Sequence, residues 1–572
     1  MMINGIGVSP GIAIGKAHLL KKQEATLSGV VLSNDADIIA ETTKFNNAVS
    51  LSVIEIEAMI SNYDQSQGIE GLEILETHIE LLTDPQISED VTEKISKEKK
   101  NVNDAVIEVI AGAVQLFKNM DDEYLSARAA DVQDIGNRLL RNLNASNQTH
   151  TPLYEADTII IAEDLTPSDT ISMDITHVIG FATQVGGRTS HAAIIARSRG
   201  IPTVVGCGVT LLDIKDGDLV ILDGQSGAII IKPGQEIVEE YRVKRENWLK
   251  QTSRLRSLKN TPATTTDGIH IKLLANIGDA NDMDQAIGFG AEGSGLLRTE
   301  LLFMGRDALP GEDEQFEFYK AVALKAKGKP VIVRTLDIGG DKQLPYLNFP
   351  AEQNPFLGYR AIRICLDRPD IFITQLKAIL RASAFGQLKI MFPMISNIQE
   401  VRAAKLILQQ AKDELIKASI AFDKNIPVGI MIEIPSAAIT ADLLAKEVDF
   451  FSIGTNDLCQ YTLAVDRMNE QIKNLYDPYN PGVLRLIANV IEQGHQNNIE
   501  VGMCGELASD PKATLLLLGM GLTGFSMSAT AIPEIKNIII NSSLTAAKQI
   551  HKRVMEMDRS DLITAYLQEA TP

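Results

Sequence analysis

A glycine-rich turn that ends in a histidine is the strongest chemical signal in the sequence. Residues 186–191 read Gly-Gly-Arg-Thr-Ser-His, after a mostly apolar run, Ile175 to Val185, that predicts a strand. The segment from His191 to Arg199 predicts a helix, with two hydroxyl residues available as N-caps. Unpaired backbone N–H groups and the helix dipole favour a dianion at such a helix start. The turn predicts a phosphate carried on the imidazole of His191; the alternative is a core-facing histidine beside a tight turn.

Two arginines in the C-terminal half stand where short apolar runs end. Arg298 closes the run Ser294–Arg298, and Arg334 lies near the end of Val331–Thr335. Two converging guanidinium groups suit a phosphate, because each planar fork can donate two hydrogen bonds at once. The alternative for each arginine is a structural ion pair with a neighbouring carboxylate.

Two carboxylates, Glu433 and Asp457, follow two further apolar runs. Carboxylate oxygens are the ligands that Mg²⁺ prefers, and this ion usually takes one or two of them together with substrate oxygens and water. The pair therefore predicts a magnesium site, with pairing to the same arginines as the alternative. Arg467 follows in a loop, where it either binds a carboxylate or is an ordinary exposed arginine.

Cys504 lies in the sequence Gly-Met-Cys-Gly-Glu, residues 502–506. A buried cysteine is usually a small core residue. At the end of an apolar run and close to two glycines, its thiol could instead donate a proton to a reacting group.

Eight short apolar runs alternate with helical segments over the C-terminal half, which predicts a (β/α)₈ barrel. In that fold the carboxyl ends of the strands meet on one rim, where active sites form. Besides the residues above, the rim would receive Asn276, Met394, Asn456 and Ser528. The predicted strands are Ile271–Ile277, Ser294–Arg298, Val331–Thr335, Leu388–Pro393, Val428–Ile434, Phe450–Ile453, Glu500–Cys504 and Gly524–Met527.

The N-terminal half divides into two textures. From about residue 34 to 145 the apolar spacing is helical, and from about 150 to 232 short β-rich runs alternate with glycine turns. A strand near Gly7–Ala17 can join the β-rich region at about 150–232 to form one α/β unit, and the helical region would then be an insertion in that unit. The charged stretch Gln235–Leu258 predicts a linker helix. The predicted helices of the insertion are Thr42–Ile60, Gly71–Leu82, Asp90–Ser96, Asp104–Met120 and Ala127–Leu143.

Composition narrows the class of protein. A length of 572 residues suggests about three or four domains. The formal net charge of −20, most of it between Glu24 and Ser146, argues against nucleic-acid binding. The acidic segment is either a docking surface for a basic partner or a solvated face that keeps the protein soluble. The four scattered cysteines, the lack of a signal-peptide pattern and the lack of a long apolar run lead us to expect a soluble, cytoplasmic protein.

Six motifs, in order and over nearly the whole chain, resemble those of Enzyme I of the bacterial phosphoenolpyruvate-dependent sugar phosphotransferase system. The match begins at Ser9-Pro-Gly-Ile-Ala13. The motifs are Gly-Gly-Arg-Thr-Ser-His191, Gly-Leu-Leu-Arg-Thr-Glu300, Val-Arg-Thr-Leu-Asp-Ile-Gly-Gly-Asp341, Asn-Pro-Phe-Leu-Gly-Tyr-Arg360, Ile-Gly-Thr-Asn-Asp457 and Gly-Met-Cys-Gly-Glu506.

This resemblance implies a mechanism and a role for each candidate residue. Phosphoenolpyruvate would phosphorylate His191, with Thr170 as hydroxyl partner, and the phosphoryl group would pass to the histidine-containing phosphocarrier protein as the first step of sugar uptake. Cys504 would protonate the enolate carbon to release pyruvate. The implied binding residues are Arg298, Arg334, Asn456, Asp457 and Arg467 for substrate, Glu433 and Asp457 for Mg²⁺, and Arg360 in support.

The resemblance also implies an α/β multidomain fold with a swivelling phosphohistidine domain and a homodimer formed through the barrel. The carrier would dock on the acidic helices around Gly71–Leu82, where His78 is the position to watch. Two alternatives are a dikinase-like enzyme and a non-catalytic phosphate-sensing protein. The implied domains are 1–23 with 147–232 (phosphohistidine), 24–146 (inserted helical), 233–260 (linker helix) and 261–572 (barrel).

Overall fold

The computed structural model divides the chain into two compact units, Met1–Gln251 and Thr252–Pro572. The structure describes the backbone of all residues except those named at the end of this paragraph. For residues 70–73, 118 and 123–128 it describes the backbone alone. The predicted site residues His191 and Thr170 lie outside the described residues. The residues not described are 21–26, 62–69, 119–122, 145–153, 167–168, 170–175, 188–192, 194–195, 197–199, 305, 307, 341–343, 345, 348–351, 470 and 572.

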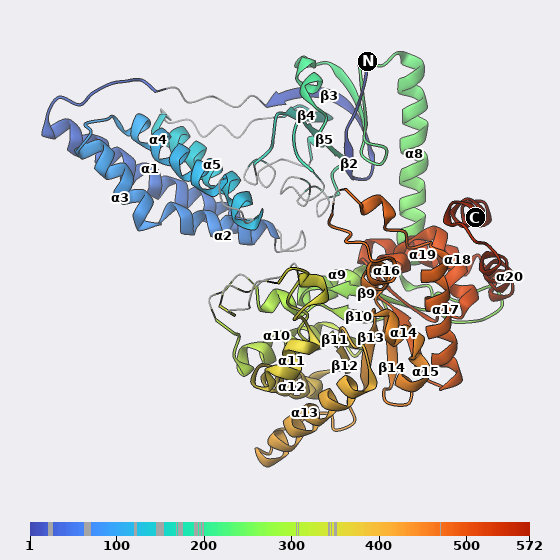
Figure 1. The fold of residues 1–572 in the computed structure, drawn as a ribbon. Coiled ribbons are helices and arrows are strands. Elements are labelled where there is room, and N and C mark those ends of the chain that lie inside the picture. The colour runs from blue at the N-terminus through green and yellow to red at the C-terminus, as the bar shows by residue number, and fades with distance from the viewer. Residues whose placement is uncertain are drawn as a thin grey trace. The chain divides into compact units, whose positions relative to one another are not determined.

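An eight-stranded sheet forms the α/β part of the first unit, in the order β1-β8-β7-β3-β4-β5-β6-β2 (Figure 1). Its central strand β4 is buried along its whole length, which explains its uninterrupted apolar sequence. The strands are β1 Met2–Asn4, β2 Ile6–Ser9, β3 Ile12–Leu20, β4 Thr158–Ala162, β5 Val178–Thr183, β6 Thr203–Val205, β7 Leu219–Asp223 and β8 Ala228–Ile231, with the 3₁₀ turn η2 at Val209–Asp213.

The chain leaves this sheet after β3 and returns to it at β4. β3 pairs in parallel with β4 and antiparallel with β7, so strands from the start and the end of the α/β part lie side by side. The helices in between are therefore an insertion, as the sequence predicted. They are α1 Asp35–Ser61, α2 Glu70–Leu82, α3 Pro85–Ser96, α4 Val102–Lys118 and α5 Glu123–Asn144, and α8 Gln235–Ser257 follows the sheet.

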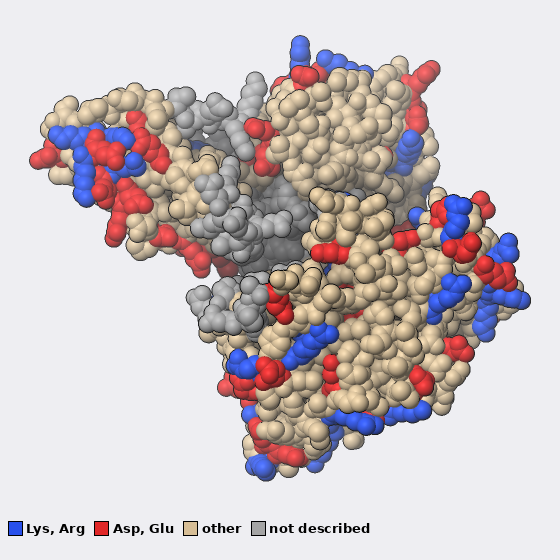
Figure 2. All heavy atoms as spheres, viewed as in Figure 1, with Lys and Arg blue, Asp and Glu red and all other residues tan. Residues whose placement is uncertain are grey.

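The inserted helices share a core of their own, in which Phe45, Ile56, Leu75, Val106 and Ile135 are buried. Their outer faces carry many charges, and Figure 2 shows Asp and Glu side chains mixed with Lys over this part of the chain. The exposed acidic residues there include Glu76, Glu80, Glu89, Asp90 and Glu93.

Eight parallel strands close into a barrel in the second unit, so the predicted fold class is confirmed. Closure comes from β16 pairing with β9, in the register Gly524 to Lys272 through Met527 to Ala275. The strands are β9 Lys272–Ile277, β10 Ser294–Leu297, β11 Val331–Arg334, β12 Leu388–Phe392, β13 Val428–Ile432, β14 Phe450–Ile453, β15 Glu500–Met503 and β16 Gly524–Met527.

Helices cover the outside of the barrel (Figure 1), and the candidate site residues lie at the carboxyl ends of the strands, in the segments that follow them or in the first turn of the next helix. The helices are α9 Ala280–Gly288, α10 Glu312–Lys325, α11 Ile362–Asp367, α12 Pro369–Ala382, α13 Ile398–Lys417, α14 Pro435–Ile439, α15 Ala441–Leu444, α16 Thr455–Leu463, α17 Pro481–Gln496, α18 Pro511–Met520, α19 Ile532–Ile540, α20 Leu544–Met555 and α21 Ser560–Ala570. The 3₁₀ turns are η3 Leu258–Asn260, η4 Glu300–Leu302, η5 Pro355–Leu357, η6 Ser383–Phe385, η7 Lys473–Leu475, η8 Glu506–Ser509 and η9 Ala529–Ala531.

Two expectations from composition can be compared with the structure. All four cysteines are free and buried, so none forms a disulfide. Within the described residues, every helix is too short or too polar to cross a membrane.

Candidate active site

Arg334, the last residue of β11, is buried at the rim of the barrel between two carboxylates. Its Nη2 donates to Glu300 Oε1 at 2.7 Å, and its Nη1 lies 2.7 Å from Asp337 Oδ2. Burial alone would lower the pKa of Arg334, but the carboxylates of Asp337, Glu300 and Glu433 raise it above the ordinary value. The guanidinium is therefore held in one place and fully charged. The ion pairs weighed as an alternative for this arginine are present.

Arg360 joins the same cluster from the segment before α11. Its Nη2 donates to Asp337 Oδ1 at 3.0 Å and lies 3.7 Å from Asp457 Oδ2, while its Nη1 donates to the Tyr461 hydroxyl at 3.2 Å. Asp337 thus connects Arg360 with Arg334. Gly339 allows this approach, because a Cβ there would lie 2.5 Å from the Arg360 Cβ and the residue has a φ of +105°.

Glu433 follows β13 and is almost completely buried. Its Oε1 accepts the backbone N–H of Met394 at 2.6 Å, and Met394 holds the uncommon positive φ of 57° at this point of the rim. Burial raises the pKa of Glu433 to about 8, and the nearby carboxylates of Asp457 and Asp337 act in the same direction. Among the described residues no cationic side chain forms an ion pair with Glu433, so a bound cation or a proton would compensate its charge.

Asp457 lies in the first turn of α16 and is also buried. Among the described residues its Oδ1 has no hydrogen-bond partner. Two guanidinium groups lie 3.7 Å from the carboxylate, Arg467 Nη1 from Oδ1 and Arg360 Nη2 from Oδ2. A Cβ on Gly454 would lie 3.1 Å from Glu433 Oε2, so the Glu433 carboxylate packs against the backbone just before α16. An unpartnered buried carboxylate oxygen close to a second carboxylate fits the donor set of Mg²⁺. Among the described residues, no group of three or more His, Cys, Asp and Glu is suited to a metal, so these two would need substrate oxygens to complete the shell.

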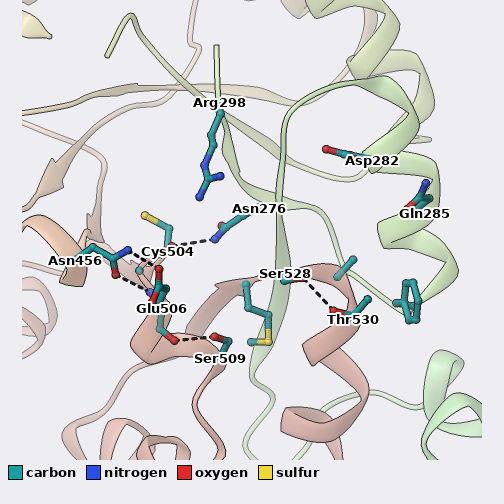
Figure 3. Close-up of a pocket in the computed structure, with 14 residues that line it drawn as sticks. Asn276, Asp282, Gln285, Arg298, Asn456, Cys504, Glu506, Ser509, Ser528 and Thr530 are labelled. Carbon is teal, nitrogen blue, oxygen red and sulfur yellow. Dashed lines mark hydrogen bonds between the residues drawn. The ribbon is translucent and has the colours of Figure 1, made fainter. Parts of the chain in front are cut away.

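A pocket of about 380 Å³ opens beside this buried cluster. It is lined by Arg298, Asn276, Asn456, Cys504 and Glu506 among others, and Figure 3 shows Arg298 pointing from its strand end toward Cys504 and Asn276. Arg298 is exposed to solvent, whereas Arg334 is buried. The pocket therefore offers an anionic ligand a thiol, amide donors and a guanidinium that forms no ion pair within the part of the chain that the structure describes.

Cys504 follows β15 and is held through its backbone. Its N–H donates to the Ile453 carbonyl at 3.1 Å, and its own carbonyl accepts from Asn276 Nδ2 at 2.9 Å. Burial raises the pKa of the thiol above its ordinary value, despite opposing effects from Ser452, Arg334 and Arg298. The thiol stays protonated at neutral pH, which suits a proton donor more than a nucleophile.

The structure brings the predicted barrel residues together in two neighbouring groups. Arg298, Asn456 and Cys504 line the pocket, and Asn276 and Ser528 line it with them. Arg334, Arg360, Glu433 and Asp457 form the buried cluster, with Arg467 at its edge.

Three functional carboxylates were missed from the sequence. Glu300 and Asp337 fix Arg334, and Glu506 binds Asn456. Each stands within three residues of a predicted site residue in the same motif, so proximity in the motif was the available signal. Periodicity gave none, because Glu300 and Glu506 begin short 3₁₀ turns and Asp337 lies in an irregular segment after its strand.

His78 was expected to mark the docking surface for the carrier, and this expectation is wrong because the side chain is not on the surface. It is fully buried, with Nε2 3.4 Å from Asp131 Oδ1 and Nδ1 3.9 Å from Asp134 Oδ2. Its place one helical turn after Leu75 and before Leu82, both buried, puts it on the inner face of α2. Glu76 and Glu80 of the same helix are exposed.

Comparison with known protein families gives the class first. The family models for phosphoenolpyruvate-utilising enzymes match in three parts: the N-terminal domain at residues 4–128, the mobile domain at 154–227 and the phosphoenolpyruvate-binding domain at 252–544. The barrel with its anion pocket thus coincides with a phosphoenolpyruvate-binding domain.

Full-length relatives then give the particular family. The phosphoenolpyruvate-protein phosphotransferase of Staphylococcus carnosus is 45% identical over 100% of this chain and 99% of its own. That of Bacillus subtilis is 47% identical over 99% of both, and that of Priestia megaterium is 48% identical over 94% and 93%. A solved structure of an Enzyme I protein shares 40% identity, covers 43% of this chain and 99% of its own, and has a TM-score of 0.35. The chain belongs to the phosphoenolpyruvate-protein phosphotransferases, a family of transferases, which confirms the predicted family and favours it over the dikinase-like and non-catalytic alternatives.

Proposed function

We propose that the chain transfers the phosphoryl group of phosphoenolpyruvate to His191 and then to the histidine-containing phosphocarrier protein, releasing pyruvate. The observation that carries this proposal is the pocket that combines Arg298, Asn456 and the protonated thiol of Cys504 beside the buried arginine–carboxylate cluster. Five of the six motifs lie in the part of the chain that matches the phosphoenolpyruvate-binding domain of the family.

In this mechanism the arginines position and neutralise the phosphoryl group. Arg298 is free to rotate onto the phosphate, whereas Arg334 is fixed by Glu300 and Asp337 and supplies a charge that does not need to move. Such preorganised charge suits phosphoryl transfer, which depends on positioning and charge neutralisation more than on covalent help.

Glu433 and Asp457 would hold Mg²⁺, with Arg467 and Asn456 binding the remaining oxygens of the substrate. When bound, the ion would supply additional neutralisation of the phosphate charge. Deprotonation of Glu433 would accompany its binding, because a carboxylate must lose its proton to act as a ligand.

Cys504 completes the reaction. Transfer breaks the bond between phosphorus and the enol oxygen and leaves the enolate of pyruvate in the pocket. The Cys504 thiol gives its proton to the enolate carbon, which forms pyruvate, and the thiolate recovers a proton from water. Because its pKa is raised, the Cys504 thiol remains protonated and can donate this proton.

The carrier is proposed to dock on the inserted helices, where Glu76 and Glu80 are exposed on α2. Opposite charges on a basic carrier would speed the encounter. We place the protein in the cytoplasm as a homodimer formed through the barrel. The proposed domains are 1–23 with 147–232 for the phosphohistidine, 24–146 for the carrier, a linker at 233–260 and the barrel at 261–572.

The central test replaces His191 with Ala and supplies phosphoenolpyruvate labelled at phosphorus together with Mg²⁺. Labelling of the chain should be lost while binding of phosphoenolpyruvate to the barrel is retained. His177→Ala, a histidine change in the same α/β unit, is the matched control and should label normally. Labelling of the His191→Ala chain would refute the assignment.

A second test addresses the dock. Glu73→Lys, Glu76→Lys and Glu80→Lys combined should slow transfer to the carrier and reduce its dependence on salt, because electrostatic steering is lost. Self-phosphorylation should be nearly unchanged. An equal loss in both steps would point to misfolding or to a different docking surface.

A further inference from the structure

The side-chain amide of Asn456 is bound on two sides by one residue, Glu506. Asn456 Nδ2 donates to Glu506 Oε1 at 3.1 Å, and the backbone N–H of Glu506 donates to Asn456 Oδ1 at 3.0 Å (Figure 3). A carboxylate only accepts and a backbone N–H only donates. The two bonds together therefore fix which end of the amide is nitrogen and which is oxygen.

The two segments that carry this pair are packed without space for adjustment. Asn456 follows β14, and Glu506 follows β15. A Cβ on Gly505 would lie 1.9 Å from Thr455 Oγ1 and 2.5 Å from Thr455 N, so the backbones touch at this point. The Cys504 N–H also donates to the Ile453 carbonyl at 3.1 Å, and this bond fixes the register between the strand ends.

The orientation of the amide matters because both residues line the anion pocket with Arg298 and Cys504. With its nitrogen end fixed, Asn456 keeps a second N–H for a ligand in the pocket. With the amide reversed, Oδ1 would face the same ligand, and an oxygen lone pair repels an anion.

We infer that Glu506 is a positioning residue, which holds Asn456 in the orientation that donates a hydrogen bond to phosphoenolpyruvate. The inference rests on the proposed binding of substrate by Asn456. In this inference the exposed carboxylate of Glu506 supports the binding of an anion, although its own negative charge would repel that anion.

The negative charge of Glu506 allows a positioning role to be distinguished from a direct electrostatic role. Glutamine at this position keeps an acceptor for Asn456 Nδ2 and the same backbone N–H, but removes a negative charge from the pocket. If Glu506 acts by positioning, Glu506→Gln should bind phosphoenolpyruvate as well as the parent chain or better. Glu506→Ala keeps only the backbone contact, so the amide can turn.

The experiment measures kcat and KM for phosphoenolpyruvate by pyruvate release, with the carrier present in excess. Glu506→Ala should raise KM about tenfold, the loss expected when one hydrogen bond to a charged group is weakened. The change in kcat should be smaller, and Glu506→Gln should restore KM. Glu492→Ala is the matched control, because Glu492 on the surface of α17 accepts from an amide, Gln496 Nε2, at the same 3.1 Å; it should leave both constants unchanged.

Two further variants separate this inference from the proposal beneath it. Asn456→Ala should raise KM at least as much as Glu506→Ala, and the double variant should be no worse than Asn456→Ala alone, because Glu506 acts through Asn456. An unchanged KM in Asn456→Ala would refute the substrate role of Asn456 itself.

If Asn456→Ala is impaired and Glu506→Ala is not, only the positioning role falls. Equal impairment of Glu506→Gln and Glu506→Ala would also overturn it, since the carboxylate would then act by its charge or as a proton relay to Cys504. A purely structural role predicts a lower melting temperature without rescue by glutamine, which circular dichroism of the same four variants would reveal.

Discussion

At the scale of the residue, the chemistry depends on which groups are kept protonated and which are kept charged. Burial keeps the Cys504 thiol protonated, and carboxylates keep Arg334 charged in the same rim. The two effects coexist because the carboxylates contact the arginine directly, while the thiol meets mainly apolar neighbours such as Met391 and Met431. A proton donor and a fixed cation are thereby supplied within one small volume.

Cys504→Ala should lower steady-state turnover of phosphoenolpyruvate by about 10²–10⁴-fold, the usual effect of removing a positioned general acid. Substrate binding should persist, because the arginines and carboxylates are intact. Exchange of phosphate between His191 and the carrier should also persist, since it does not use the thiol. Cys207→Ala, which removes another buried thiol far along the sequence in the sheet unit, should turn over normally. Near-normal turnover of Cys504→Ala would remove the thiol from the mechanism.

Glu433 should make the stability of the metal-free chain depend on pH. Its pKa is raised from 4.5 to about 8 in the folded chain. The stability it contributes is fully present below pH 4.5 and is lost as the pH rises through about 8, because the unfolded chain releases the proton earlier.

Calorimetry of the barrel transition in the presence of a chelator checks this prediction. The melting temperature should fall between pH 5 and pH 8 more steeply for the parent chain than for Glu433→Gln, whose amide does not titrate. Glu492→Gln, a change at an exposed carboxylate, should follow the parent curve. Parallel curves for the parent and Glu433→Gln would show that Glu433 ionises normally.

Much of the residue-scale site could be predicted from sequence. Arg298, Glu433 and Asp457 were identified because a barrel collects its strand ends on one rim, whatever the packing around them. Their partners could not be found in this way. Asp337 binds Arg334 and Arg360, yet it lies in an irregular segment whose path is set by tertiary packing, not by periodicity.

At the scale of the element, a buried polar network fixes the ends of β10 and β11. Gln375 on α12 accepts from the Leu336 N–H at 2.9 Å and donates to Thr299 Oγ1 at 3.3 Å. Thr299 in turn donates to the Arg334 carbonyl at 2.9 Å. The network thus connects the segments that follow Arg298 and Arg334, and it can hold the two arginines at a constant separation.

Gln375→Leu should destabilise the barrel by about 1–3 kcal/mol, because the buried Leu336 N–H loses its acceptor. It should also raise KM for phosphoenolpyruvate, through displacement of the two arginines. Gln409→Leu on the exposed face of α13 is the matched control and should change stability by less than about 0.5 kcal/mol. Urea unfolding and steady-state kinetics measure the two effects; unchanged values of both in Gln375→Leu would show that the network is dispensable.

Helix ends show where sequence patterns were insufficient. We predicted a helix from Asp90, but α3 begins at Pro85, where Asp84 caps it by accepting the N–H of Gln86. The Asp-Pro pair is a recognised start signal, and the apolar spacing outweighed it in our prediction. Strand ends were closer, since β14 and β16 match their predicted limits and β11 ends one residue early at Arg334.

At the scale of the whole molecule, the proposed residues for phosphoenolpyruvate binding and the proposed phosphate acceptor His191 belong to different units of the chain. The barrel residues lie in the unit Thr252–Pro572, and position 191 lies in the unit Met1–Gln251. The insertion of helices between β3 and β4 could be predicted from the sequence. The pattern changes from helical to β-rich near residue 150, and the isolated N-terminal strand needs partner strands.

A fragment that ends at Leu258 should therefore retain one of the two phosphoryl-transfer steps, the exchange with the carrier. The cut falls after α8 and inside the η3 turn, where Lys536 of the barrel donates to the Leu258 carbonyl at 3.3 Å and to the Lys259 carbonyl at 3.0 Å. The fragment keeps the sheet, the inserted helices and His191, so it should fold and accept phosphate from a phosphorylated carrier. It lacks Arg298, Arg334, Glu433 and Cys504, so phosphoenolpyruvate with Mg²⁺ should leave it unlabelled.

Labelling with phosphorylated carrier and with phosphoenolpyruvate, side by side, measures both halves of this prediction. The same fragment with His191→Ala is the control, and it should accept phosphate from neither donor. Phosphorylation of the unmodified fragment by phosphoenolpyruvate would contradict the two-site arrangement, because the chemistry would then need no barrel. Failure with both donors, in a fragment that circular dichroism shows to be folded, would instead place part of the carrier's docking surface beyond Leu258.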